Sequence, residues 1–309
     1  MIKQLLKQPQ FLLGFFIIIS LLFVSLGLNS IYEGPKEVKF LYKNDGSISK
    51  VAPFSPTDIP PFGTDRDGRD LFYMILNGAK YTLLIALGVA FLRLVSAVLI
   101  SFLYKGQLKN NTFFNDLVQS TLYVPATIFA YMLMIPLFIK STTDPISFGK
   151  MVIIQCIILT LIGIPSLVVT FSGDIKNIMN KDYIISTMSL GAKKKYIYRK
   201  HVLPEIKPKL FLLFAQQAVQ ILILLAHLGV LAVFVGGSQT EMRGDFLNLT
   251  AENVPIAGEW SGIIGHSFQE VLTAPWIILI PLGFFFVSIF SINMMISGLQ
   301  NIISKNKRK

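Results

Sequence analysis

Six long runs of apolar residues constrain this chain more than any other feature. A helix needs roughly 20 apolar residues to cross the hydrocarbon core of a bilayer, and the runs are about that long. Charged residues make up only 15% of the 309 residues, whereas they make up about a quarter of soluble globular domains. The sequence therefore predicts an all-α integral membrane protein with six transmembrane helices, at residues 11–28, 83–104, 113–139, 148–171, 210–235 and 275–299.

The first run follows Lys3 and Lys7, as the apolar region of a secretory signal would. A signal peptide, however, has a shorter apolar region that ends at a small-residue cleavage site. This run ends in Gly27-Leu28-Asn29-Ser30, so we expect a retained helix. The predicted organisation is an N-terminal helix at 1–29, an extracytoplasmic segment at 30–70, a core of five transmembrane helices at 71–304 and a basic cytoplasmic tail at 305–309.

The distribution of lysine and arginine predicts the orientation in the membrane. If the N-terminus is cytoplasmic and six spans alternate, seventeen of the 28 basic residues fall on the cytoplasmic side, in agreement with the positive-inside rule. The outer loop at 236–274 carries Arg243 as its one basic residue. The first outer loop has more basic residues, but long loops translocate largely regardless of charge. Both termini are therefore expected to be cytoplasmic.

The net charge of +11 follows from this topology. Basic loops lie against anionic lipid headgroups, so we expect a lipid membrane and no nucleic acid as their partner. The sequence contains no Gly-rich phosphate loop, no Cys and His at metal-ligand spacing and no nucleophile elbow. Its single cysteine, Cys156, lies inside an apolar run. We expect no catalytic, cofactor or metal site in the chain, which is therefore not an enzyme by itself.

The cytoplasmic loop at 174–208 has the most distinctive internal design. Asp182 is a candidate N-cap for a short helix at 183–190, and Gly191 can adopt the left-handed conformation that ends a helix. A second short helix is predicted at 192–202, where several lysines and one arginine lie on consecutive turns. The sequence therefore predicts a charged docking surface between two membrane spans.

This helix–Gly–helix–Leu-Pro layout resembles the cytoplasmic "EAA" loop of ATP-binding-cassette importer permeases. In that family a Glu-Ala-Ala triplet precedes a Gly, and a Leu-Pro follows. Gly191, Leu203 and Pro204 occupy the matching places, but Ile185-Ser186-Thr187 replaces the triplet, so its glutamate is missing. The resemblance implies that an ATPase docks on this coupling loop, through Asp182, Tyr183, Ser186, Thr187, Gly191, Ala192, Lys193, Lys195, His201, Leu203 and Pro204.

Two further stretches are similar to the oligopeptide, dipeptide and nickel branch of these permeases. Residues 62–70 read Phe-Gly-Thr-Asp-Arg-Asp-Gly-Arg-Asp, and Thr273-Ala274-Pro275-Trp276 resembles the opening of that branch's last helix. The order and spacing of the stretches extend the resemblance over nearly the whole chain. The residues that match the family motifs are Gly63, Thr64, Asp65, Gly68, Arg69, Asp70, Trp260, Pro275 and Trp276.

The resemblance implies a type I importer fold in a bacterial cell membrane and a role as one permease subunit for peptides. It also implies a heterodimer with a second, homologous permease, two ATPase subunits that bind ATP and Mg, and an extracytoplasmic substrate-binding lipoprotein. Nickel or a metal chelate remains an alternative cargo. A secondary transporter or a non-transporting membrane scaffold remains an alternative class.

Two residues inside the predicted spans have open roles. Arg93 either lines a pathway for substrate carboxylates or is a packing cation shielded from lipid. His227 either lines the pathway or forms a hydrogen bond between helices. On the outer side, residues 30–59 predict a small hairpin or ordered loop. This segment and 237–259 either modify docking of a binding protein, cover the outer mouth, or are plain surface loops.

Overall fold

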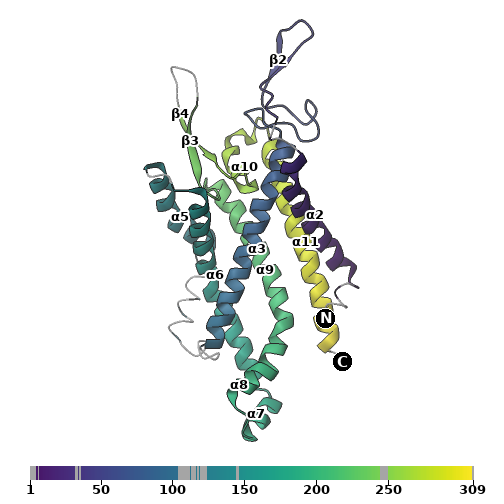
Figure 1. The fold of residues 1–309 in the computed structure, drawn as a ribbon, viewed down its shortest axis with the longest axis vertical. Coiled ribbons are helices and arrows are strands. Elements are labelled where there is room, and N and C mark those ends of the chain that lie inside the picture. The colour runs from purple at the N-terminus through teal and green to yellow at the C-terminus, as the bar shows by residue number, and fades with distance from the viewer. Residues whose placement is uncertain are drawn as a thin grey trace.

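The computed structural model describes residues 7–31, 36–103, 124–143, 146–243 and 250–307, together with residues 5, 34, 112, 116 and 118. Long helices run along one common axis (Figure 1). Two β-hairpins lie at one end of this axis, and the short helices α7 (Asp182–Ser189) and α8 (Lys194–Ile197) lie at the other. Helix α2 (Pro9–Ile31) begins and helix α11 (Trp276–Lys307) ends in the half that contains α7 and α8. After the orientation predicted from the sequence, which stays a prediction, we name the end with the hairpins the outer end and the end with α7 and α8 the inner end.

The bundle is organised around two helices, α3 (Leu71–Leu103) and α9 (Leu203–Val230), which pack against each other. Their buried sides form a continuous apolar core with the neighbouring helices. Leu71, Ile75 and Leu83 of α3 and Ile221 and Leu222 of α9 are fully buried there. The helices that pack around this pair are α2 (Pro9–Ile31), α5 (Ala126–Thr143), α6 (Phe148–Met179) and α11 (Trp276–Lys307).

Five of the described helices, namely α2, α3, α6, α9 and α11, are long and apolar enough to cross a membrane. Large apolar side chains lie exposed on their outer faces, among them Phe16, Phe23 and Phe286. Such faces suit hydrocarbon and not water. Helix α5 is apolar but shorter, and most of residues 113–123, where the third span was predicted to begin, lie outside the described residues. The six-span prediction therefore stays a prediction.

The second span begins earlier than the predicted residue 83. Helix α3 starts at Leu71, because the Asp70 carboxylate accepts a hydrogen bond from the backbone N–H of Phe72 at 2.9 Å and caps the helix. Ser25 of α2 accepts a hydrogen bond from the Lys80 backbone N–H at 2.9 Å, so a contact between helices supports this part of α3, which precedes the apolar run.

The fifth span was predicted to reach residue 235, but α9 ends at Val230. The chain turns there through Ala232, whose φ of 56° is left-handed. Ala232 N–H donates to the Gly229 carbonyl and Val233 N–H to the Leu228 carbonyl, both at 2.9 Å. This is the Schellman arrangement, in which glycine usually holds the left-handed position. Because alanine stands there, the sequence carries no visible stop signal.

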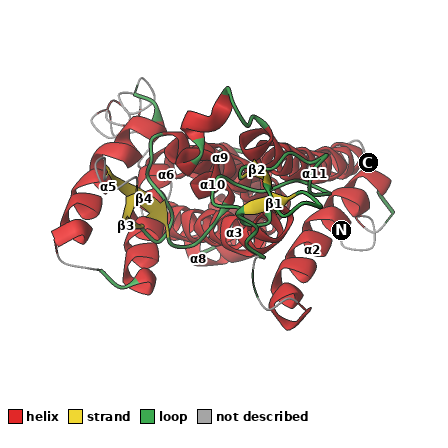
Figure 2. Ribbon diagram, turned by 90° about the horizontal axis from the view of Figure 1, so that it is seen from above, coloured by secondary structure: helices red, strands yellow, loops and turns green. Residues whose placement is uncertain are grey.

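The two hairpins occupy the outer segments, as the sequence indicated for 30–59. Strands β1 (Phe40–Tyr42) and β2 (Ile48–Val51) pair antiparallel, and so do β3 (Ser238–Arg243) and β4 (Thr250–Pro255). Seen along the bundle axis, the two hairpins lie over different helices (Figure 2). The β3–β4 hairpin lies within the predicted outer loop at 236–274, between α9 and α11.

A short helix, α10 (Trp260–His266), packs tightly on the outer end of α9. A Cβ atom at Gly265 would overlap the carbonyl oxygen of Gly229, and one at Gly229 would overlap the backbone of Ser261. Trp260 is fully buried, and its indole N–H donates to the Ile75 carbonyl at 2.7 Å. The two glycines thus let the backbones approach closely enough for Trp260 to reach the bundle core.

We predict that Gly265→Ala lowers the thermal unfolding midpoint of the purified protein by several degrees. The added methyl group collides with fixed backbone, and overpacking of this kind costs about 1–3 kcal/mol. The measurement is a thermal melt in detergent. Gly88→Ala is the matched control, because nothing lies within 4 Å of a Cβ at Gly88. Equal midpoints for the two variants would contradict the close approach of α9 and α10.

Candidate functional site

The predicted coupling loop folds as a short helix on the end of the bundle. Helix α7 begins one residue earlier than expected, with Lys181 at the N-cap and no side-chain cap. The Lys181 carbonyl accepts hydrogen bonds from Ile184 and Ile185 N–H at 2.9 and 3.0 Å. The prediction that Asp182 is the N-cap is therefore wrong. Asp182 lies in the first helical turn, where its negative charge interacts favourably with the helix dipole.

A second apolar cluster fixes this loop to the transmembrane helices. Ile184 of α7, Ile197 of α8 and Val202 are fully buried. They pack with residues of α3, α6 and α9, including Phe171 and Ile175 of α6. A fully buried isoleucine contributes about 1.5–3 kcal/mol relative to an exposed one. The loop therefore forms one packed body with the inner ends of three long helices.

The opposite side of the loop presents apolar side chains to solvent. Leu190 is 89% exposed, and Ile185, Tyr183 and Tyr196 are about half exposed. Basic side chains surround them, because Lys193, Lys194, Lys195, Arg199 and Lys200 are all exposed. This exposed apolar patch with a basic rim has the composition of a protein contact surface.

Four further predicted coupling residues form backbone hydrogen bonds or ring contacts within the loop. Gly191 has the expected left-handed φ of 88°, and its N–H donates to the Met188 carbonyl at 2.9 Å. The hydroxyls of Ser186 and Thr187 donate to carbonyls one turn earlier, at 2.9 and 2.6 Å. His201 lies between the rings of Tyr183 and Tyr196, with centroids 5.7 and 6.1 Å away.

The helix predicted at 192–202 is not separate from the following span. Helix α8 passes through a π-helical turn, Tyr198–Val202, directly into α9 at Leu203. Pro204 directly follows this π-helical turn and does not interrupt the continuous helix. Lys181 also forms an ion pair with Glu205, and Tyr183 donates to Glu205 at 3.2 Å. Both ends of the coupling loop are therefore tied to α9.

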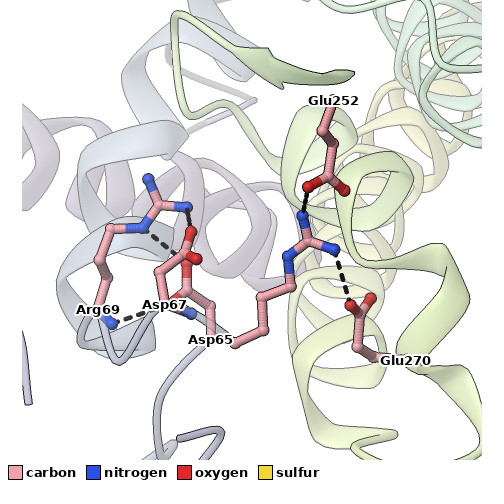
Figure 3. Close-up of polar contacts among 6 residues, drawn as sticks. Asp65, Asp67, Arg69, Glu252 and Glu270 are labelled. Carbon is pink, nitrogen blue, oxygen red and sulfur yellow. Dashed lines mark hydrogen bonds and ion pairs between the residues drawn. The ribbon is translucent and has the colours of Figure 1, made fainter. Parts of the chain in front are cut away.

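At the outer end, residues 63–70 form a compact turn around the buried carboxylate of Asp65. Its oxygens accept hydrogen bonds from the N–H groups of Asp67 and Arg69 at 3.0 and 2.8 Å and from the Arg69 Nε at 2.7 Å. Arg69 also pairs with Asp67 at 2.9 Å (Figure 3). Burial raises the pKa of the Asp65 carboxyl, and the Arg69 charge opposes this shift. The motif is thus a folded structural unit.

The remaining motif residues join this turn to its neighbours. Gly63 and Gly68 have positive φ and leave no room for a Cβ atom against the backbone of Phe54 and Val38. The Thr64 hydroxyl accepts from Phe54 N–H at 2.9 Å, and the Thr64 carbonyl accepts from the Trp276 indole at 3.3 Å. Pro275 precedes α11, and its carbonyl accepts from Leu279 N–H at 2.9 Å.

Sequence reasoning missed the role of Arg66 inside this motif. Arg66 forms ion pairs with Glu252 of β4 and with Glu270 of the 3₁₀ turn Phe268–Val271, the latter at 3.1 Å. Figure 3 shows both carboxylates on the same side of the motif. Burial lowers the Arg66 pKa, but the two carboxylates outweigh burial and raise it. Arg66 thus ties the β3–β4 hairpin to the entrance of α3.

Two polar side chains that the sequence analysis did not single out bond the backbone between α9 and β3. Gln155 of α6 donates to the Phe234 carbonyl and accepts from Gly236 N–H, both at 2.8 Å. The Glu259 carboxylate accepts from Val235 N–H at 2.8 Å. Glu259 lies outside the long helices and is fully buried, so that burial raises its pKa to about 7. Together the two side chains satisfy the backbone where α9 has ended.

Arg93 and His227 lie inside the bundle and on its surface, respectively. Arg93 is only 3% exposed and donates to the Leu159 carbonyl and to Gln217. His227 is exposed, and its Nδ1 lies 3.2 Å from the Thr127 hydroxyl of α5. The contacts match the packing role for Arg93 and the interhelical hydrogen bond for His227. Among the described residues, no group of three or more His, Cys, Asp or Glu is arranged to hold a metal ion.

Comparison with known proteins places these features in a family context. Residues 97–292 match the family described as "Binding-protein-dependent transport system inner membrane component". The oligopeptide transport system permease protein OppC of Bacillus subtilis is 23% identical, over 82% of this chain and 75% of its own. The di/tripeptide transport system permease protein DppC of Pseudomonas aeruginosa is 22% identical, over 82% and 80%. The match spans α6, the coupling loop and most of α11.

We predict that Asp65→Asn destabilises the outer turn. Asparagine cannot accept hydrogen bonds with both of its terminal atoms, so one Arg69 contact is lost, which costs about 1–3 kcal/mol for a buried group. The thermal midpoint should fall by several degrees in detergent. Asp45→Asn, at the exposed tip of the β1–β2 hairpin, is the control, since asparagine is well tolerated in turns. An unchanged midpoint for Asp65→Asn would contradict this account of the motif.

We also predict that stability falls as the pH rises from about 4.5 to 7 through Glu259. In this window the unfolded chain ionises while the folded state keeps its proton, so the folded state binds more protons. Glu259→Gln imitates the neutral carboxyl and should raise the thermal midpoint at pH 8 relative to the unmodified protein. Melts of both proteins at pH 5 and pH 8 test this. If the difference between the two proteins is the same at both pH values, the assignment is wrong.

Proposed function

Because this chain belongs to the family of binding-protein-dependent transport system inner membrane components, we propose that it is a permease subunit of an ATP-driven importer of peptides. The peptide assignment draws on the relatives, which are named as permeases of oligopeptide and di/tripeptide transport systems. A homologous permease would complete the pathway, two ATPase subunits would bind ATP and Mg, and a binding protein would deliver the cargo from outside.

One observation carries the coupling part of this proposal. The α7–α8 loop is packed into the inner ends of α3, α6 and α9 on one side and exposes Leu190, Ile185 and Tyr183 on the other. A partner that moves this exposed patch therefore moves a rigid body joined to three helices. Such a connection converts closure of the ATPases into alternating access of the pathway.

The missing glutamate of the EAA triplet changes how docking would work. Ile185 takes part in the exposed apolar patch, whereas Ser186 and Thr187 use their hydroxyls on the backbone of their own helix. We infer that docking relies on apolar contact at Leu190 and Ile185, with the surrounding lysines attracting an acidic rim on the ATPase. A few residues at the desolvated centre of an interface typically supply most of its binding energy, tyrosine prominent among them.

The decisive experiment is Leu190→Asp in the full complex, isolated from its native membrane. A charge at the centre of the apolar patch should lower the amount of co-purified ATPase about tenfold or more, while the second permease still co-purifies. Leu272→Asp is the matched control, because Leu272 is 91% exposed and lies near the outer end of the bundle. Full retention of the ATPases in Leu190→Asp would contradict α7 as the docking site.

A further inference from the structure

Helix α9 carries a row of polar side chains on its exposed side. The row consists of three polar residues and one apolar residue, namely Gln216, Gln220, His227 and Ile223. They are spaced three or four residues apart, so they lie on one face of the helix. Gln220, Ile223 and His227 are exposed, and Gln216 is half-buried. The neighbouring positions Ala218, Ile221 and Leu222 are buried in the core. The row is therefore a surface of the bundle.

The depth of Gln220 in the membrane makes this row unusual. Gln220 lies ten residues before the end of α9, which corresponds to about 15 Å of helix and so to the middle of a bilayer core about 30 Å thick. An amide that faces hydrocarbon there has no hydrogen-bond partner. Polar groups at this depth face a protein interior or a water-filled cavity. Hence this face of α9 contacts either protein or a water-filled cavity in the assembled transporter.

Gln220 is the end of a hydrogen-bonded relay that starts at a buried cation. The Arg93 Nη1 donates to the Oε1 of Gln217 at 3.1 Å, and the Nε2 of Gln217 donates to the Oε1 of Gln220 at 3.0 Å. Arginine has donors but no acceptor. It therefore fixes the orientation of the Gln217 amide, which in turn fixes that of Gln220. The Nε2 group of Gln220 is left as a donor at the exposed end.

The contacts around Arg93 fix the orientation of its guanidinium group. Its Nε and Nη2 both donate to the Leu159 carbonyl, at 2.8 and 2.5 Å. Gly163, one turn further along α6, lies against the guanidinium, which occupies the space that a Cβ there would need. Three helices, α3, α6 and α9, thus contribute to the relay. A cation fixed in this way also favours electron-rich oxygens near the exposed end.

We propose that Gln220 is a binding site for backbone carbonyl oxygens of the transported peptide, with Gln217 and Arg93 as the positioning residues. An extended peptide presents a carbonyl oxygen at every residue whatever its side chains, so a row of amide donors binds peptides without reading their sequence. This inference rests on the proposed function and adds to it the chemistry by which the pathway holds its cargo. It also explains the burial of an arginine in a membrane helix.

The test uses the complete transporter in vesicles, with its binding protein and a defined mixture of short synthetic peptides. Gln220→Glu keeps the size of the side chain but replaces the amide donor with an acceptor. We expect the uptake of peptide per ATP hydrolysed to fall about tenfold, as one lost hydrogen bond predicts. The remaining uptake should shift from glutamate-rich towards lysine-rich peptides. Gln217→Glu, which removes the donor to Gln220, should give a smaller loss with the same ATPase rate.

Gln300→Glu is the matched control, because Gln300 is an exposed amide near the inner end of α11, beyond the predicted apolar span and outside the relay. Its uptake should equal that of the unmodified complex. If Gln220→Glu leaves both the peptide uptake and the preference between glutamate-rich and lysine-rich peptides unchanged, Gln220 is not a peptide-binding residue, and the proposed function still stands. Loss of the second permease from Gln220→Glu would overturn this inference as well, since the row would then be a subunit interface. Absence of peptide uptake by the unmodified complex would instead contradict the proposed function and this inference together.

Discussion

Hydrocarbon supplies no hydrogen bonds, and this constraint shapes the break in the chain at the end of α9. Where α9 stops at Val230, the turn satisfies its own backbone through Ala232 and Val233, and Gln155 and Glu259 satisfy the next three residues. An unsatisfied buried group would cost several kcal/mol in this environment. The close packing of α10 against α9 depends on this turn, and so does the burial of Trp260.

The two ends of the bundle solve different problems with different chemistry. At the outer end, ion pairs of Arg66 and Arg69 hold the motif, the β3–β4 hairpin and the start of α3 together. At the inner end, apolar packing of Ile184 and Ile197 fixes the coupling loop. The ion pairs fix the geometry at the start of α3. The apolar packing joins the coupling loop to α3, α6 and α9, so that they can move as one body. This division fits the proposed function, in which the permease receives its cargo at the outer end and is moved by the ATPases at the inner end.

Particular residues show which local structures could be predicted from the sequence and which could not. The left-handed conformation of Gly191 was predicted from local residue chemistry, and the structure confirms it. The end of α9 could not be predicted, because alanine occupies the position where glycine would mark a stop. The start of α3 was placed too late, because the predicted span followed the apolar run from residue 83, whereas the helix begins at its Asp70 cap.

The sequence by itself determined the membrane environment, the family and the position of the coupling loop, because apolar run length, charge distribution and short motifs are local properties of the chain. Only the tertiary structure decided what Arg66, Arg93 and Glu259 contact, because their partners lie dozens to hundreds of residues away. The physical reason is that a buried charge is stable only beside its partner, and the fold alone brings the two together.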